Sequence, residues 1–239
     1  MGRIKKGLIP LMSTTRNWYK LAEAAPNITP AEFQAMTYKE KKALAKNKSI
    51  SPETQQLFFT EKYWDKNEII WDLAENTSIS PQTQQLFFTG EYYGNDDRDD
   101  EYKRIVLGYL AENKSITPQT QLLFFAEKYK QKNYALQYLA TNTSIYPQTQ
   151  KMFFTEDYWD KDIALQYLAR NTSITLATQL LFFTEEYDSK QLVLKNLSDN
   201  PSFLKGLTLQ EMREFTKAKE ARLYVYKKRF KDIKAMVLL

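Results

Sequence analysis

The chain has 239 residues, of which 34 are lysine or arginine and 29 are aspartate or glutamate, giving a net charge of +5 at pH 7. It contains no cysteine and no histidine, which excludes disulfides, thiol nucleophiles, imidazole acid–base chemistry and Cys/His zinc sites. Hydrophobic residues make up 43% and aromatic residues 14% of the sequence, enough for a sizeable core. We therefore expect a folded protein, in which an enzyme would have to work with carboxylates, lysine, tyrosine or serine alone. Our expectation is a protein that is not an enzyme and uses neither a cofactor nor a metal ion, and an enzyme using Asp, Glu or Lys in a concave groove is the third alternative.

Residues 1–39 are predicted to form a basic N-terminal cap that includes a degenerate first repeat, NITPAEFQAM, at residues 27–36. The apolar stretch near the N-terminus covers only residues 8–12, which is too short for a signal peptide. No apolar run approaches the roughly 18 residues that a transmembrane helix requires. These patterns favour a cytoplasmic protein that does not enter a membrane.

Residues 40–204 contain five copies of a repeat, each ending in asparagine. The terminal asparagines are Asn76, Asn113, Asn142, Asn171 and Asn200. Their spacing is 29 residues, except that the step from the first to the second is 37. The eight extra residues, GNDDRDDE, occupy positions 94–101 and are predicted to form a solvated acidic loop. A fixed period of this length indicates stacked supersecondary units.

Each copy is predicted to fold as two helices. Serine or threonine precedes proline in several copies, as in Ser51-Pro52 and Thr117-Pro118, which is typical of an N-cap followed by the first helical residue. The second helix carries apolar residues at helical spacing, for example at positions 135, 136, 139 and 140. The terminal asparagine is predicted to end this helix as a left-handed C-cap.

A phenylalanine doublet occurs in the first helix of every copy. The doublets are Phe58/Phe59, Phe87/Phe88, Phe124/Phe125, Phe153/Phe154 and Phe182/Phe183. Consecutive side chains lie about 100° apart on a helix, so one ring can face its own repeat and the other its neighbour. We expect the doublets to hold the array together, because a repeat of this size cannot bury its apolar face alone.

Residues 205–239 are predicted to form a basic helical cap at the C-terminal end. An apolar stripe with helical spacing runs through this segment: Leu223, Tyr226, Phe230, Ile233 and Val237. The net charge is +7 over residues 1–50, −8 over residues 51–204 and +6 over residues 205–239. The basic ends could supply a patch for nucleic acid or an acidic protein, with these residues as candidates: Lys41, Lys42, Lys227, Lys228 and Lys231.

The motif LAxNxSIxPxTQxLF resembles the leucine-rich repeat variant family and, more loosely, HEAT-type repeats over residues 40–203. This resemblance implies a binding scaffold, of a kind that occurs in bacterial and viral (phage) proteins. The repeat pattern predicts an all-α, superhelical α-solenoid of two-helix units with helical N- and C-terminal caps.

Positions identical in every copy are most simply explained by architecture, so recognition should lie where the copies differ. The fourth and fifth residues before each terminal asparagine vary most. The resulting candidates for a partner-binding concave face are Trp71, Asp72, Tyr109, Gln137, Tyr138, Gln166, Tyr167 and Lys195. Tyrosine offers rigid amphipathic contact area. The alternative is that these rings only pack between adjacent helices.

The sequence therefore predicts a scaffold that grips a protein partner, as an inhibitor or an assembly factor. The alternative is an α-solenoid that binds nucleic acid through its basic ends. The two differ in the expected salt dependence of binding.

Overall fold

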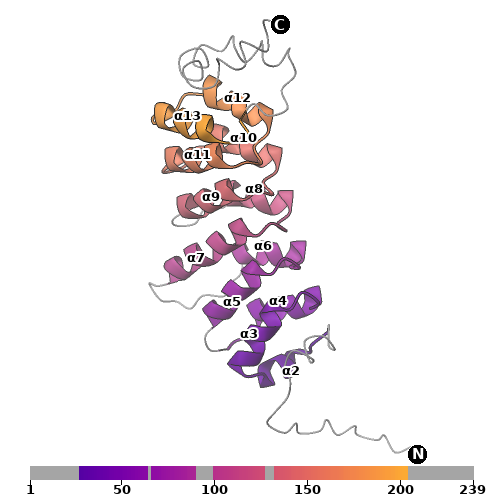
Figure 1. The fold of residues 1–239 in the computed structure, drawn as a ribbon. Coiled ribbons are helices and arrows are strands. Elements are labelled where there is room, and N and C mark those ends of the chain that lie inside the picture. Colours follow the sequence, from indigo (N-terminus) through magenta and orange to yellow (C-terminus); the bar gives the residue numbers. More distant parts are fainter. Residues whose placement is uncertain (1–26, 64–65, 90–98, 127–131, 204–239) are drawn as a thin grey trace, which may run out of the picture.

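The computed structural model describes residues 27–63, 66–89, 99–126 and 132–203. These residues form twelve α-helices and no strand, which confirms the predicted all-α fold. Successive helix pairs stack in one direction into an elongated array (Figure 1). The first helices of the pairs are α2 (Pro30–Ala35), α4 (Pro52–Thr60), α6 (Pro81–Thr89), α8 (Pro118–Ala126), α10 (Pro147–Thr155) and α12 (Leu176–Thr184). The second helices are α3 (Tyr38–Lys46), α5 (Lys66–Glu75), α7 (Asp99–Glu112), α9 (Lys132–Thr141), α11 (Lys161–Arg170) and α13 (Lys190–Asp199).

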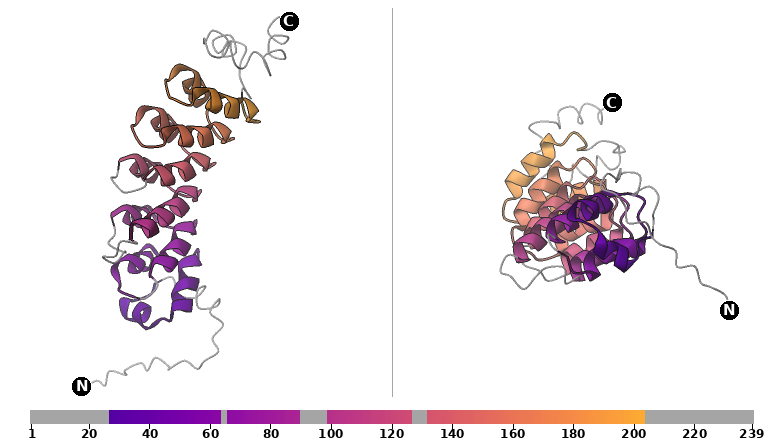
Figure 2. Two further views of the ribbon diagram at one scale, coloured as in Figure 1. Left: turned by 90° about the vertical axis from the view of Figure 1, so that its left-hand side faces the viewer. Right: turned by 90° about the horizontal axis from the view of Figure 1, so that it is seen from below.

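The helices lie in two rows, one of first helices and one of second helices (Figure 2). Each second helix packs on the second helix of the next repeat, from α3 through to α13. The backbones approach more closely along this row than along the row of first helices. The second helices therefore form the more closely packed of the two rows. None of the described helices is both long and apolar enough to span a bilayer.

Hydroxyl N-caps start most of the first helices, as the sequence predicts. The side chain of Ser51 accepts a hydrogen bond from the amide of Thr54 at 3.2 Å, with Pro52 at the first helical position. Thr117 caps α8 and Thr175 caps α12 in the same way. These caps satisfy amide groups that an isolated helix start leaves without a partner.

The phenylalanine doublets pack as predicted. The first ring of each doublet is fully buried, and in the first four doublets the second ring meets the first ring of the next repeat edge-on. The centroid distances across the repeat boundaries are 5.0 Å for Phe59–Phe87, 4.9 Å for Phe88–Phe124, 5.0 Å for Phe125–Phe153 and 4.8 Å for Phe154–Phe182. Edge-to-face pairs at this separation are favourable beyond the area that they bury. One continuous hydrophobic core thus runs through the described repeats, with an edge-on ring pair at each of these boundaries.

The prediction of left-handed C-caps at the asparagines was wrong. Asn171 has φ −69° and ψ 122°, which is extended backbone, and Asn47 and Asn200 are extended too. The side chain instead bridges two repeats: Asn142 donates through Nδ2 to the carbonyls of Ala111 at 2.7 Å and Asn113 at 3.1 Å. Its Oδ1 accepts from the amide of Ser144. A buried amide satisfied in this way fixes the register between neighbouring units.

A lysine at or near the start of the second helix of each full repeat also stabilises the fold, and we call it the architectural lysine. Its Nζ donates to the carbonyl of the second phenylalanine of its own repeat, as for Lys161 and Phe154 at 2.5 Å and for Lys190 and Phe183 at 3.0 Å. This places a cation at the C-terminal end of the first helix, where the backbone carbonyls lack helical partners. Lys66, Lys103 and Lys132 make the same bond in their repeats.

The eight extra residues at 94–101 lengthen one second helix. Helix α7 has 14 residues, whereas α5, α9, α11 and α13 have 10 each. The expected acidic loop is therefore helical from Asp99 onward, and residues 94–98 lie outside the described part. The N-terminal residues 1–26 and the predicted C-terminal cap at 205–239 lie outside it as well.

Candidate functional site

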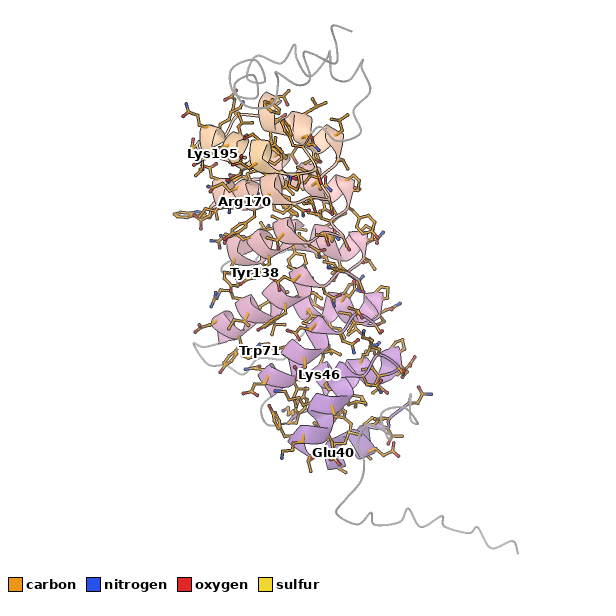
Figure 3. All side chains as sticks on the ribbon, viewed as in Figure 1. Glu40, Lys46, Trp71, Tyr138, Arg170 and Lys195 are labelled. Carbon is orange, nitrogen blue, oxygen red and sulfur yellow. The ribbon has the colours of Figure 1, made fainter. Side chains whose placement is uncertain are left out.

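The sequence-predicted binding residues lie on the second helices, on the side that points away from the first helices. Figure 3 shows labelled members of this side, from Lys46 through Trp71 and Tyr138 to Arg170 and Lys195, following one another along the array. We call this surface the inner face. It is built from the first, fourth, fifth and eighth residues before each terminal asparagine.

Helical geometry explains why these positions share one face. Residues three and four apart lie above one another on a helix, as do positions eight, four and one before the asparagine. The second, third, sixth and seventh positions carry Ala, Leu, Ile or Val in most copies and are buried. The face that remains contributes less to the core, and its side chains differ from repeat to repeat.

Ion pairs occupy the N-terminal end of the inner face. Asp72 lies 3.0 Å from Lys46 and 3.8 Å from Lys42, measured between the charged atoms, and Lys42 lies 3.7 Å from Glu68. A hydrogen bond with Tyr38 raises the pKa of Lys42. Asp72 is therefore bound within the chain and is a poorer candidate for contact with a partner than the sequence suggests.

Lys41 does not belong to the basic patch predicted for this end. Its side chain is 4% exposed, its Nζ donates to the carbonyl of Met36 at 2.5 Å, and it lies 5.1 Å from the ring centroid of Phe33. Burial lowers its pKa. Lys41 thus caps a first helix, as the other architectural lysines do. Lys42 is engaged by two carboxylates, while Lys227, Lys228 and Lys231 lie outside the described residues.

Three aromatic rings meet on the inner face where α5 packs on α7. The Trp71 ring lies 6.0 Å from that of Tyr102 and 6.3 Å from that of Tyr109, with interplanar angles of 36° and 40°. All three side chains are half-buried. The indole Nε1 of Trp71 is covered and has no hydrogen-bond partner among the described residues. Sequence reasoning missed Tyr102, because its place depends on the extra turn of α7.

Two carboxylates border this ring cluster. Glu75 follows Trp71 by one turn of α5, and Glu112 follows Tyr109 by one turn of α7. Burial, followed by the charge of Glu75, raises the pKa of Glu112, so the two carboxylates are close enough to repel each other. Neither forms an ion pair within the described part of the chain.

A second aromatic pair joins α9 to α7. The Tyr134 and Tyr138 rings lie 4.7 Å apart edge-on, their hydroxyls are 2.7 Å apart, and the guanidinium of Arg104 lies 4.2 Å from the Tyr134 centroid. The hydrogen bond with Tyr134 raises the pKa of Tyr138 to about 12. A Cβ on Gly108 would lie 3.3 Å from Tyr134 and 3.4 Å from Tyr138, so this glycine lets the rings approach. Tyr138 therefore packs between helices as well as facing solvent.

Apolar exposure is concentrated at the C-terminal end of the inner face. Tyr167 is 37% exposed, Ile163 40% and Leu192 46%, and Trp159, just before α11, is 86% exposed. Gln137 and Gln166 are half-buried beside them, and Lys195 is exposed. The sequence analysis missed Ile163 and Leu192. Comparing the eighth residue before each asparagine would have found them, because this position also differs from copy to copy. It is occupied by Glu68, Ile105, Tyr134, Ile163 and Leu192.

No family model, curated protein or solved structure matches the chain. The resemblance to leucine-rich repeat variant and HEAT-type repeats stays a prediction from the repeat motif. Within the ranges that the structure describes, no group of three or more acidic residues is placed to hold a metal ion.

Proposed function

We propose that this protein is a repeat scaffold that binds a protein partner on its inner face. The observation that carries the proposal is the contrast between the two sides of the second helices. The buried side repeats nearly the same residues in each full copy, whereas the inner face changes from ion pairs to aromatic rings to exposed aliphatic groups. Packing of the repeats explains the first side, whereas it does not explain the exposed apolar groups of the second.

The composition of the inner face supports a protein as the partner. Exposed apolar side chains such as Ile163, Tyr167 and Leu192 cost solvation free energy unless another surface covers them. Tyrosine and tryptophan are enriched in the residues that dominate binding between proteins. An elongated array can engage an extended partner over several repeats, which suits an inhibitor or an assembly factor.

Binding of nucleic acid is the weaker candidate. The described inner face carries Glu68, Asp72, Glu75 and Glu112, and carboxylates repel phosphate groups. The lysines at its N-terminal end are buried or paired with these acids.

The proposal is tested by capture experiments with the full chain as bait. The variant Tyr167→Ala/Leu192→Ala removes two exposed apolar groups from the inner face, and we expect it to lose the proteins that the parent chain captures. The matched control is Tyr146→Ala, which removes an exposed ring at the start of a first helix. Equal capture by the parent and both variants would refute binding through the inner face. Circular dichroism establishes that each variant keeps its helices.

A further inference from the structure

We propose that the inner face binds an arginine side chain of a basic segment of the partner between α5 and α7. This inference rests on the proposed function and specifies the chemistry of the partner. The site consists of Trp71, Glu75, Tyr102, Tyr109 and Glu112, which we call the acidic–aromatic seam. It joins two neighbouring repeats and lies on the row followed in Figure 3, where Trp71 is labelled.

The first observation is the open arrangement of the rings. The Trp71 ring lies at 36° to Tyr102 and 40° to Tyr109, and all three remain partly accessible. The faces of aromatic rings are electronegative and attract cations within about 6 Å of the centroid. A guanidinium group also stacks flat on such rings, which an ammonium group cannot do.

The second observation is the pair of carboxylates without a cation. Everywhere else on this half of the inner face the acids are paired, as Asp72 is with Lys46 at 3.0 Å. Glu75 and Glu112 are near each other, and neither pairs with a lysine or arginine in the described ranges. Two uncompensated like charges destabilise the array. A partner's cation would relieve this repulsion.

The third observation is that the only departure from the 29-residue period helps to build this site. The eight extra residues lengthen α7, and Tyr102 lies in the added turn. In the two other full repeats where the residue just before the architectural lysine is described, it precedes the second helix instead of belonging to it, as Asp160 does before α11 and Ser189 before α13. The insertion therefore adds a ring to the seam that the other repeats lack.

Arginine fits these three observations together. Its planar group can stack on the rings while its N–H donors reach a carboxylate in a two-bond fork. A phosphate would meet two negative charges at the seam, and a neutral side chain would leave their repulsion in place. The charge of −8 over residues 51–204 attracts a basic segment toward the array from a distance.

The test measures binding of fluorescein-labelled hexa-arginine to the full chain by fluorescence anisotropy. Hexa-citrulline, a neutral analogue of nearly the same shape, serves as the matched probe. We expect Glu75→Gln/Glu112→Gln to weaken hexa-arginine binding by about tenfold or more, since the variant loses the charged hydrogen bonds to the guanidinium group. Tyr102→Ala should weaken it as well. Helicity by circular dichroism should match the parent for both variants.

The matched control removes two charges elsewhere. Glu156→Gln/Glu185→Gln changes the net charge by the same amount, at the ends of two first helices. If this control loses as much affinity as the seam variant, attraction is unspecific and the proposal is overturned. If hexa-citrulline binds the parent chain as tightly as hexa-arginine does, the proposal is overturned too. Should the seam variants behave like the control while Tyr167→Ala/Leu192→Ala loses the captured partner, the scaffold function stands and only the arginine site fails.

Discussion

Thr149 is buried at the start of α10, and its hydroxyl has no hydrogen-bond partner in the part of the chain that the structure describes. The equivalent residues in other repeats bond to the N-cap hydroxyl, as Thr178 does to Thr175 at 2.9 Å and Thr83 to Ser80 at 2.8 Å. In this repeat Tyr146 occupies the N-cap, and its side chain makes no capping bond. One residue that departs from the repeat therefore leaves a buried donor unsatisfied.

Tyr146→Ser should restore the missing cap. The serine hydroxyl can accept from the Thr149 amide and bond the Thr149 hydroxyl, as its counterparts do. Compared with Tyr146→Ala, which also removes the ring, we expect the serine variant to have a free energy of unfolding higher by about 1 kcal/mol. Urea denaturation followed by circular dichroism measures the difference. Equal stability of the two variants would mean that the cap is unimportant here.

Residue-level roles were predictable where they depend on local chain geometry. Ser51 before Pro52 predicted a helix start, and the structure has one there. The terminal asparagines predicted a cap of the wrong kind, because Asn142 makes its bonds to carbonyls 29 and 31 residues earlier in the chain. Such contacts depend on how closely two repeats stack. No local pattern in the sequence specifies that distance.

At the scale of helices, the doublets let a first helix contact the first helices of both neighbouring repeats. Phe124 of α8 has no exposed surface, and its ring lies 4.9 Å from that of Phe88 in the preceding repeat. Phe125, one position further, contacts Phe153 in the following repeat at 5.0 Å. A helix of nine residues is marginal by itself, so its stability comes from these contacts.

Phe124→Ala should therefore destabilise the whole array. Removing a fully buried ring leaves a cavity that rigid helices on both sides cannot fill, at a cost of about 3–5 kcal/mol. The measurement is the free energy of unfolding in urea. Leu123→Ala on the same helix is the control, because Leu123 is only half-buried. If Phe124→Ala lowers the free energy of unfolding no more than the control does, the doublet does not hold neighbouring repeats together.

The sequence predicted the two helices of each unit well, since apolar spacing and caps are local signals. It placed the binding face on the second helices by analogy with other solenoids, and this placement stays a prediction. Which residues of the face pair with each other could not be predicted. Asp72 and Lys46 belong to successive repeats, and their contact depends on the rotation between them.

At the scale of the whole molecule, each described helix pair makes its main contacts with the adjacent pairs. The stability of such an array is approximately the sum of unit and interface contributions. A change in the length of one connection should therefore leave the core of the other repeats intact. The 37-residue repeat shows this tolerance, because α7 packs on α5 and α9 as the other second helices pack on their neighbours.

Excising residues 94–101 restores the 29-residue period and tests what the insertion contributes. We expect the melting temperature to change little, because the buried residues of α7, such as Val106 and Leu110, keep their spacing from Lys103. Tyr102 would no longer lie in a helical turn beside Trp71, and the Trp71 ring would become more exposed. In a chain whose other tryptophans are phenylalanine, Trp71 emission should shift to longer wavelength and hexa-arginine should bind more weakly. Asp96→Asn/Asp97→Asn, which keeps the length, should behave as the parent. Unchanged emission after the excision would show that the insertion does not shape the seam.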